Sequence, residues 1–102
     1  MPDFTIEKTE QNIFLISGEL SFSTVSKALS ESSHLFHGES AMIVDLINVN
    51  HVDSAGIALL IEWLGMAKHK TKKLEYRHIP EQMLAIARIS GLESVLVGIN
   101  ID

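Results

Sequence analysis

The sequence predicts an α/β fold with a mixed, mostly parallel sheet covered by helices. Short apolar or alternating segments, typical of strands, recur along the chain. The first two are joined by only three residues, the length of a hairpin loop. After them, the strand segments alternate with longer segments that have apolar residues at helical spacing. The resulting order, β-β-α-β-α-β-α, favours parallel pairing after an opening hairpin.

The whole chain, residues 1–102, is expected to form a single domain. A chain of 102 residues is long enough for one domain and too short for two. It can bury roughly 65% of the surface that its unfolded form exposes, so it needs no disulfide or metal to fold. It contains no cysteine, which excludes disulfides, thiolate metal sites and cysteine nucleophiles.

Two segments near the N-terminus predict the opening hairpin. Asp3–Lys8 alternates, with Phe4 and Ile6 on one side, and Asn12–Ser17 is more apolar throughout. We expect the chain to leave the sheet at Gly18.

The first helix is predicted over Phe22–Phe36. Ser21 or Ser23 can cap its start, although the many serines within it lower its helix propensity. After a stop at residues 37–40, a short apolar strand is predicted at Met42–Leu46, of the type expected where helices cover both faces of a sheet. The apolar face predicted for the helix consists of Phe22, Val25, Leu29 and Phe36.

The second half of the chain begins with a predicted loop over residues 47–53. Ala55–His69 has the strongest helical pattern of the chain, and Leu74–Ile79 alternates as a strand does. Both segments extend the alternation of strands and helices.

A third helix is predicted from Pro80 to Ile89. Proline suits the first position of a helix, and Gly91 is placed to stop the helix in the left-handed conformation. The tail, residues 93–102, is apolar and fits either a short strand or a partial helix.

Charge and hydropathy exclude several classes of protein. The net charge of −5 argues against a nucleic-acid partner, because such binding depends on Lys and Arg. The basic cluster at residues 68–73 fits a helix end, where cations complement the helix dipole. The longest apolar segment, Ala55–Met66, is shorter than the roughly 20 residues that cross a bilayer. The N-terminus lacks a signal-peptide pattern, so we expect a cytoplasmic protein with no direct membrane insertion.

No residue pattern predicts catalysis, a cofactor or a metal site. His34 and His37 are three positions apart, but no third ligand follows at metal spacing. His51, Asp53 and Ser54 match a hydrolase trio in composition only, because residues so close in sequence do not readily form a relay. The glycines are too scattered for a phosphate-binding loop. We therefore expect a non-enzymatic protein without cofactors or metals.

The turn before the second helix carries the functional prediction. In α/β sheets, binding sites collect at the loops that follow the carboxyl ends of strands. Asp53 or Ser54 can accept a hydrogen bond from the first N–H groups of the helix, and Asp53 also complements the helix dipole. Both residues therefore fit a plain helix cap as well as a site.

The helix that follows is apolar on two sides. One side has an ordinary core pattern around Gly56 and Leu60, whereas the other carries small residues, a Leu and a Met, with a single acid. Small residues allow close approach of another backbone, and Met adapts to irregular surfaces. This side is predicted to be covered by a partner protein, with the chain's own tail as the alternative. Its residues are Ala55, Ala58, Leu59, Glu62, Gly65, Met66 and His69.

The chain resembles the STAS domain family (sulfate transporter and anti-sigma factor antagonist). The resemblance rests on Asp53-Ser54-Ala55-Gly56 after Val44-Asp45-Leu46, on Gly91-Leu92 near the end, and on the order of elements. It covers almost the whole chain and implies the STAS fold.

Two branches of that family compete. Anti-sigma factor antagonists usually show Asp-Ser-Ser-Gly and are phosphorylated on the serine that matches Ser54. The STAS subunit of the Mla phospholipid transporter shows Asp-Thr-x-Gly-Leu-Ala-Leu-Leu and a later Ala-Lys-Lys. This chain is similar to the second pattern through residues 56–60 and 66–68, but it has serine in place of the threonine.

The transporter branch implies a regulatory or stabilising subunit on the cytoplasmic ATPase of an ABC transporter. Such a transporter moves phospholipids between the two membranes of Gram-negative bacteria and maintains outer-membrane lipid asymmetry. The subunit is then peripheral to the inner membrane through its partner. The other branch implies an antagonist whose partner is an anti-sigma factor kinase, with Ser54 phosphorylated. Together with the apolar helix side, the resemblance predicts these partner-binding residues: Asp53, Ser54, Ala55, Ala58, Leu59, Glu62 and Met66.

Overall fold

The computed structural model describes residues 3–11, 13–35, 41–69 and 73–97. Within them, an opening hairpin is followed by alternating helices and strands, as predicted. The strands are β1 (Phe4–Lys8), β2 (Ile13–Leu20), β3 (Ala41–Val52) and β4 (Lys73–Arg77). The helices are α1 (Val25–Leu35), α2 (Ser54–His69), α3 (Glu81–Ile89) and α4 (Glu93–Leu96).

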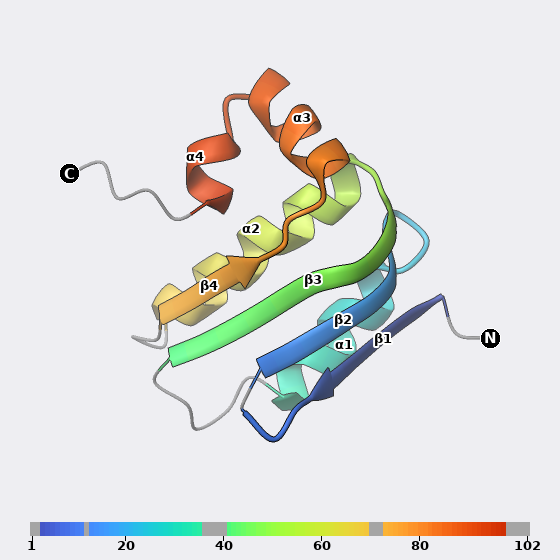
Figure 1. Cartoon of the computed structure of the whole chain (residues 1–102), viewed down its shortest axis with the longest axis vertical. Helices are drawn as coiled ribbons and strands as arrows, with labels where there is room; N and C mark the ends of the chain where they lie inside the picture. Colours follow the sequence, from blue (N-terminus) through green and yellow to red (C-terminus); the bar gives the residue numbers. More distant parts are fainter. Residues whose placement is uncertain (1–2, 12, 36–40, 70–72, 98–102) are drawn as a thin grey trace.

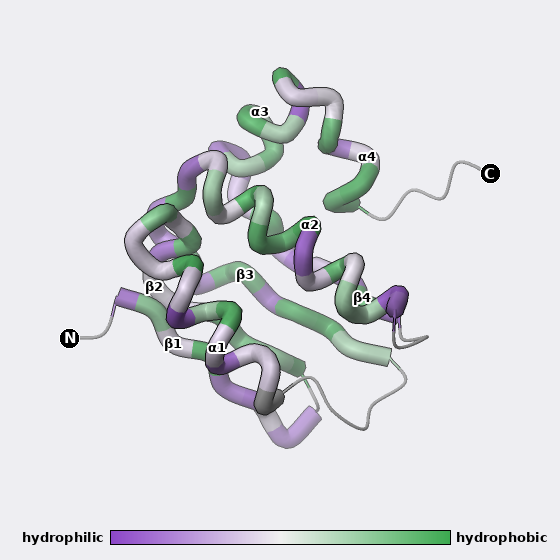
Figure 2. Tube along the Cα trace, turned by 180° about the vertical axis from the view of Figure 1, so that it is seen from behind, coloured by the Kyte–Doolittle hydropathy of each residue, from purple (hydrophilic) through white to green (hydrophobic). Residues whose placement is uncertain are grey.

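The strands form one mixed sheet in the order β1-β2-β3-β4. β1 and β2 pair antiparallel, whereas β3 pairs parallel with both β2 and β4. Helices α1 and α2 lie on one face of this sheet, behind the strands in Figure 1 and in front of them in Figure 2, and α3 and α4 pack beside α2 beyond the β4 edge. The predicted mixed, mostly parallel sheet is confirmed. The prediction that helices cover both faces is wrong, because the second face is open in the part of the chain that the structure describes, with Ile47 of β3 58% exposed.

β3 is longer than the sequence indicates. The predicted loop over residues 47–53 is wrong, because β3 continues to Val52 and pairs there with Leu20 of β2. The chain therefore does not leave the sheet at Gly18 either. Polar residues such as Asn50 suggested a loop, but they are exposed on the strand, where they keep contact with water.

The core lies between the helices and the covered face of the sheet. Its largest side chain, Trp63 of α2, is 0% exposed and donates its indole N–H to Ser32 Oγ of α1 at 2.9 Å. The Tyr76 hydroxyl of β4 donates to the Leu60 carbonyl of α2 at 2.6 Å. Burial raises the pKa of Tyr76 well above its usual value, because a phenolate would lose its hydration there. Helix α2 is thus bonded both to α1 and to the sheet.

Among the described residues, the predicted apolar face of the first helix is correct only at Val25, which packs half-buried against the core. Phe22 lies before the start of α1 and is 82% exposed, and Leu29 is 37% exposed. The side of α1 that faces the core carries the small residues Ala28 and Ser32, both 0% exposed. Small residues bring α1 close to its neighbours, and the larger side chains are left outside.

A turn held by Thr24 leads into α1. Its hydroxyl donates to the Glu19 carbonyl at 2.9 Å and accepts the Ser21 N–H at 3.1 Å. The predicted serine cap is wrong, because the hydroxyls of Ser21 and Ser23 bond to each other at 3.0 Å instead of to a helix N–H. Phe36, the last residue of the predicted helix, lies outside the described residues.

The third helix ends as predicted. Pro80 is its N-cap, one position before the predicted place, and Gly91 has a φ of 74°. The Leu92 N–H donates to the Ala87 carbonyl at 2.7 Å, which completes a Schellman motif. The tail begins as the short helix α4, the second of the two predicted alternatives, and residues 98–102 lie outside the described part.

Candidate functional site

The carboxylate of Asp53 organises the turn between β3 and α2. Its Oδ1 accepts the Ala55 N–H at 2.9 Å and the Gly56 N–H at 3.2 Å, which caps the helix. Its Oδ2 accepts the Phe22 N–H at 3.1 Å. One side chain therefore joins the start of α2 to the loop between β2 and α1, 31 positions away in the sequence.

These N–H groups stabilise the ionised form of Asp53. They lower its pKa from the usual value, the Phe22 N–H most, opposed by partial desolvation and assisted by Gly56, Ala55 and the nearby His51. A carboxyl group whose pKa falls on folding stabilises the folded chain above its unfolded pKa of about 3.9. That stabilisation is lost as the pH falls through the folded value. At neutral pH, Asp53 is an ionised helix cap.

Gly56 lets α2 approach the end of β2 closely. A Cβ atom on this residue would overlap the carbonyl group of Leu20. The Asp53 N–H donates to the same carbonyl at 3.3 Å. In the Asp-Ser-Ala-Gly segment, the aspartate and the glycine thus have structural roles, and Ser54 remains exposed at the surface.

The side of α2 that faces away from the sheet consists of small residues and one acid. A Cβ on Gly65 would meet nothing within 4 Å, so the surface there is open. Ala55 and Met66 border this side and are half-buried. We call four of its exposed residues, which precede the exposed His69 at the helix end, the outer strip of α2: Ser54, Ala58, Glu62 and Gly65.

The prediction that Leu59 contacts a partner is wrong. Leu59 is 1% exposed and belongs to the chain's own core. It lies one helical turn before Trp63, whose indole is bonded to α1, so α1 covers this side of the helix. The described part of the C-terminal segment does not provide the cover, because α4 faces Leu64 and Ala67 across a groove on another side of α2.

Phe22 is a surface residue that the sequence analysis placed in the core. Its backbone is bonded to Asp53, so it lies beside the exposed Ser54 at the start of α2. The predicted helix begins at Phe22, three residues before the observed start of α1 at Val25, and this difference put Phe22 on a helical face. The available signal was Thr24, since Ser/Thr side chains readily form turns that precede helices.

Carboxylates outnumber basic groups around this surface: His51 is the cross-strand neighbour of Glu19 and its charge acts on Asp53. Glu19 accepts the Ser21 hydroxyl, Asp53 accepts only N–H groups, and Glu62 is exposed. Five ion pairs lie elsewhere on the described residues: Lys27–Glu31, Arg77–Glu75, His78–Asp45, Arg88–Glu81 and Arg88–Glu93. This part of the surface is therefore acidic.

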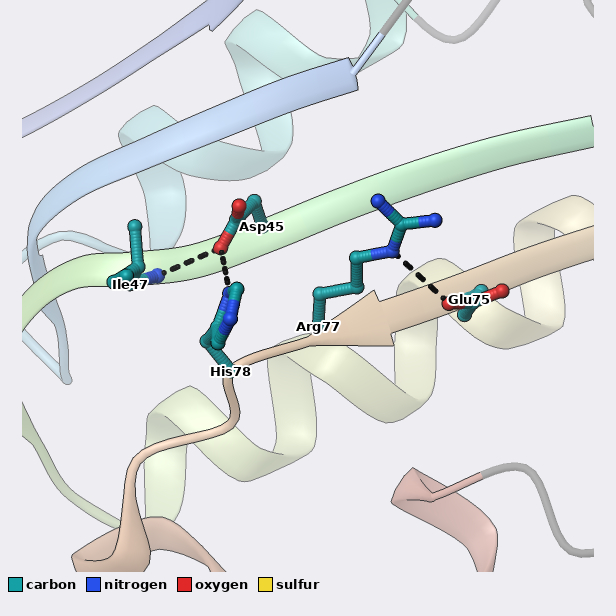
Figure 3. Close-up of polar contacts among 5 residues, drawn as sticks. All are labelled: Asp45, Ile47, Glu75, Arg77 and His78. Atoms are coloured by element: carbon teal, nitrogen blue, oxygen red, sulfur yellow. Dashed lines mark hydrogen bonds and ion pairs between the residues drawn. The ribbon is translucent and has the colours of Figure 1, made fainter.

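A second polar cluster lies on the open face of the sheet (Figure 3). Asp45 Oδ1 is 2.9 Å from His78 Nδ1 and accepts the Ile47 N–H at 3.0 Å. Arg77 Nε donates to Glu75 Oε2 at 3.2 Å. The Asp45–His78 pair holds the end of β4 to β3, with His78 in the left-handed region at a φ of 57°, whereas Glu75 and Arg77 pair within β4.

The described residues do not form a metal site. They contain no group of three or more His, Asp or Glu side chains that could hold an ion. The side chains of His34 and His37, the predicted pair that lacked a third ligand, lie outside the described part. None of the described helices is long and apolar enough to cross a membrane.

Comparison with known proteins identifies the class to which this fold and turn belong, the STAS domains. A family model described as "Mlab, STAS domain" matches residues 5–98. The chain therefore belongs to the MlaB-type STAS domain family, which confirms the predicted resemblance. No curated protein sequence matches the chain.

A solved structure shows the same fold. The anti-sigma factor antagonist SpoIIAA in its unphosphorylated form matches with a TM-score of 0.67 and 19% sequence identity. The match covers 88% of this chain and 82% of SpoIIAA. At this identity, the likeness is one of fold.

Proposed function

We propose that this chain is a non-catalytic, single-domain subunit that docks on the ATPase of an ABC transporter for phospholipids. It regulates or stabilises that ATPase in the cytoplasm, at the inner membrane, and thereby supports outer-membrane lipid asymmetry. The observation that carries the proposal is the exposed outer strip of α2 beside the Asp53 turn, in a chain of the MlaB-type family. The proposed contact residues are Ser54, Ala58 and Glu62, bordered by Ala55 and Met66, with Asp53 as the cap that holds them.

The chemistry of the outer strip suits a protein partner. The short side chains of Ser and Ala lose little conformational entropy when they are covered. Together with Gly, which has no side chain, they let a partner backbone approach α2 closely. Only Glu62 carries a full charge there, so docking requires little desolvation of ions. A helix face of Lys and Glu would have imposed both costs.

Docking on one conformation of the ATPase gives the regulation. A subunit that binds one state more tightly shifts the population toward it, by no more than the difference between its two affinities. No group on this chain needs to take part in ATP hydrolysis.

A second candidate is an antagonist that binds an anti-sigma factor kinase and is controlled by phosphorylation of Ser54. Ser54 is exposed at the start of α2, and the fold is similar to that of an anti-sigma factor antagonist. A phosphoryl group would add about −1.5 to −2 charges beside Ala58, and the cost of desolvating it would oppose docking of an apolar partner surface there. Incubation with candidate kinases, followed by intact mass measurement, distinguishes the candidates: an added phosphoryl group at Ser54 favours the second.

The transporter proposal is tested by Ala58→Arg. This residue is exposed, so the chain should fold normally, but a long cation in the centre of the outer strip should weaken ATPase binding at least about tenfold, or ~1.4 kcal/mol. Co-purification and titration with the transporter ATPase measure the effect. Thr5→Arg, an equally exposed change on the open face of the sheet, is the matched control and should bind normally. Unchanged binding of a folded Ala58→Arg variant would falsify the proposal.

A further inference from the structure

Phe22 has a fixed backbone and a free ring. Its N–H is bonded to Asp53 Oδ2 at 3.1 Å, and the Ser21 carbonyl before it accepts the N–H groups of Thr24 and Val25, each at 3.0 Å. The side chain is nevertheless 82% exposed. Because the backbone of Phe22 is already fixed, a partner that covers the ring needs to order only the side chain and not the loop.

The surroundings of Phe22 indicate the chemistry of the surface that would cover it. The ring belongs to a region that holds the carboxylates of Glu19 and Asp53, with His51 as the basic group near them. Aromatic and Arg side chains are enriched at the centres of protein interfaces. Opposite charges across an interface favour association and fix its register. The complementary surface is therefore an apolar pocket with basic residues at its rim.

We propose that Phe22 is the aromatic anchor of the docking surface and that Asp53 positions it, against an apolar pocket of the ATPase rimmed by Lys or Arg. This inference rests on the proposed function and names the chemistry of its partner. We assign Asp53 a positioning role through Phe22, because the chain's own N–H groups take three of the roughly four acceptor positions of its carboxylate.

The two oxygens of Asp53 permit a selective substitution. In Asp53→Asn, the single amide oxygen can still cap α2, but the amide nitrogen cannot accept the Phe22 N–H. The loop that carries Phe22 then loses its link to α2, and the residues of the outer strip stay unchanged.

A double-mutant cycle tests the positioning role. Dissociation constants for the ATPase are measured for the wild type, Phe22→Ala, Asp53→Asn and the double variant, with thermal unfolding of each as a check of folding. We expect Phe22→Ala to weaken binding at least about tenfold and Asp53→Asn about threefold to tenfold. The double variant should bind no more weakly than Phe22→Ala, because Asp53 then has no anchor to position. Ile47→Ala, which removes an exposed apolar side chain from the open sheet face, should bind normally.

Each outcome separates the claims. Normal binding by Phe22→Ala overturns the anchor, and additive losses in the double variant overturn the positioning role of Asp53. An affinity that does not fall with salt overturns the basic rim. A wild-type dimer that Phe22→Ala dissolves would identify a second copy as the occupant and overturn the inference. Failure of the wild type to bind the ATPase overturns the proposed function itself, and the anchor with it.

Discussion

The two sides of helix α2 are both poor in charge, but they differ in what covers them. The inner side packs Leu60 and Trp63 into the core, where bonds to β4 and α1 fix the helix. The outer strip of α2 is exposed and has no large apolar side chain. Leu59, which would have been one, is buried beneath α1. A helix with few charges is thus not apolar all round. The large exposed apolar side chain next to the outer strip is Phe22, which belongs to the neighbouring loop.

Glycine occurs on both sides of α2 for different reasons, and Gly56→Ala tests the inner one. We expect a loss of about 3 kcal/mol in the free energy of unfolding, because the added Cβ would overlap the Leu20 carbonyl and force α2 away from β2. Denaturant titration followed by the fluorescence of the single tryptophan, Trp63, measures it. A loss below about 1 kcal/mol would mean that α2 moves away from the sheet easily and that its inner side is not tightly packed.

The bond between α2 and β4 is the next largest contribution. Tyr76→Phe removes the hydroxyl that donates to the Leu60 carbonyl at 2.6 Å and should reduce the free energy of unfolding by about 1 kcal/mol. The outer strip is untouched, so binding to the ATPase should remain normal. Weakened binding by a stable variant would show that the inner side of α2 controls the outer one.

The same tyrosine gives the protein an alkaline limit. Because burial raises the pKa of Tyr76, its stabilising effect is complete below the unfolded pKa of about 10 and is lost as the pH rises toward the folded value. Unfolding curves from pH 8 to 11 should show a decline that is smaller in Tyr76→Phe. Equal declines in the two proteins would contradict this origin.

The order of elements was predictable from the sequence, because it depends on periodicity. Alternation and helical spacing survive in any packing arrangement, so the four strands and the strong helix over residues 55–69 were recognised. The end of β3 was not, since Asn50 and its polar neighbours have the composition of a loop and only pairing with β2 keeps them in the sheet. Tertiary pairing overrides local preference there.

The candidate site was predictable only where it depends on local sequence rules. Asp53 as a cap and Ser54 at the surface follow from local rules that act within one helical turn. The burial of Leu59 and the exposure of Phe22 depend on where α1 lies, and α1 packs through Ala28 and Ser32, small residues with no apolar pattern to announce them. The sequence therefore predicts which residues share a face of α2, but it does not predict which part of that face is buried by a neighbouring helix.

The smallest effect, with the opposite sign, is expected at the other glycine of α2. Gly65→Ala should raise the free energy of unfolding by about 0.5–1 kcal/mol, since glycine is unfavourable inside a helix and a Cβ there meets nothing within 4 Å. The folded chain thus gains nothing from a glycine at Gly65, whereas a partner backbone that approaches α2 closely does. The variant should therefore be more stable and yet bind the ATPase more weakly, as unfolding curves and titrations of the same sample will measure. A more stable variant with unchanged affinity would place Gly65 outside the contact and confine docking to the half of α2 nearer Ser54 and Phe22.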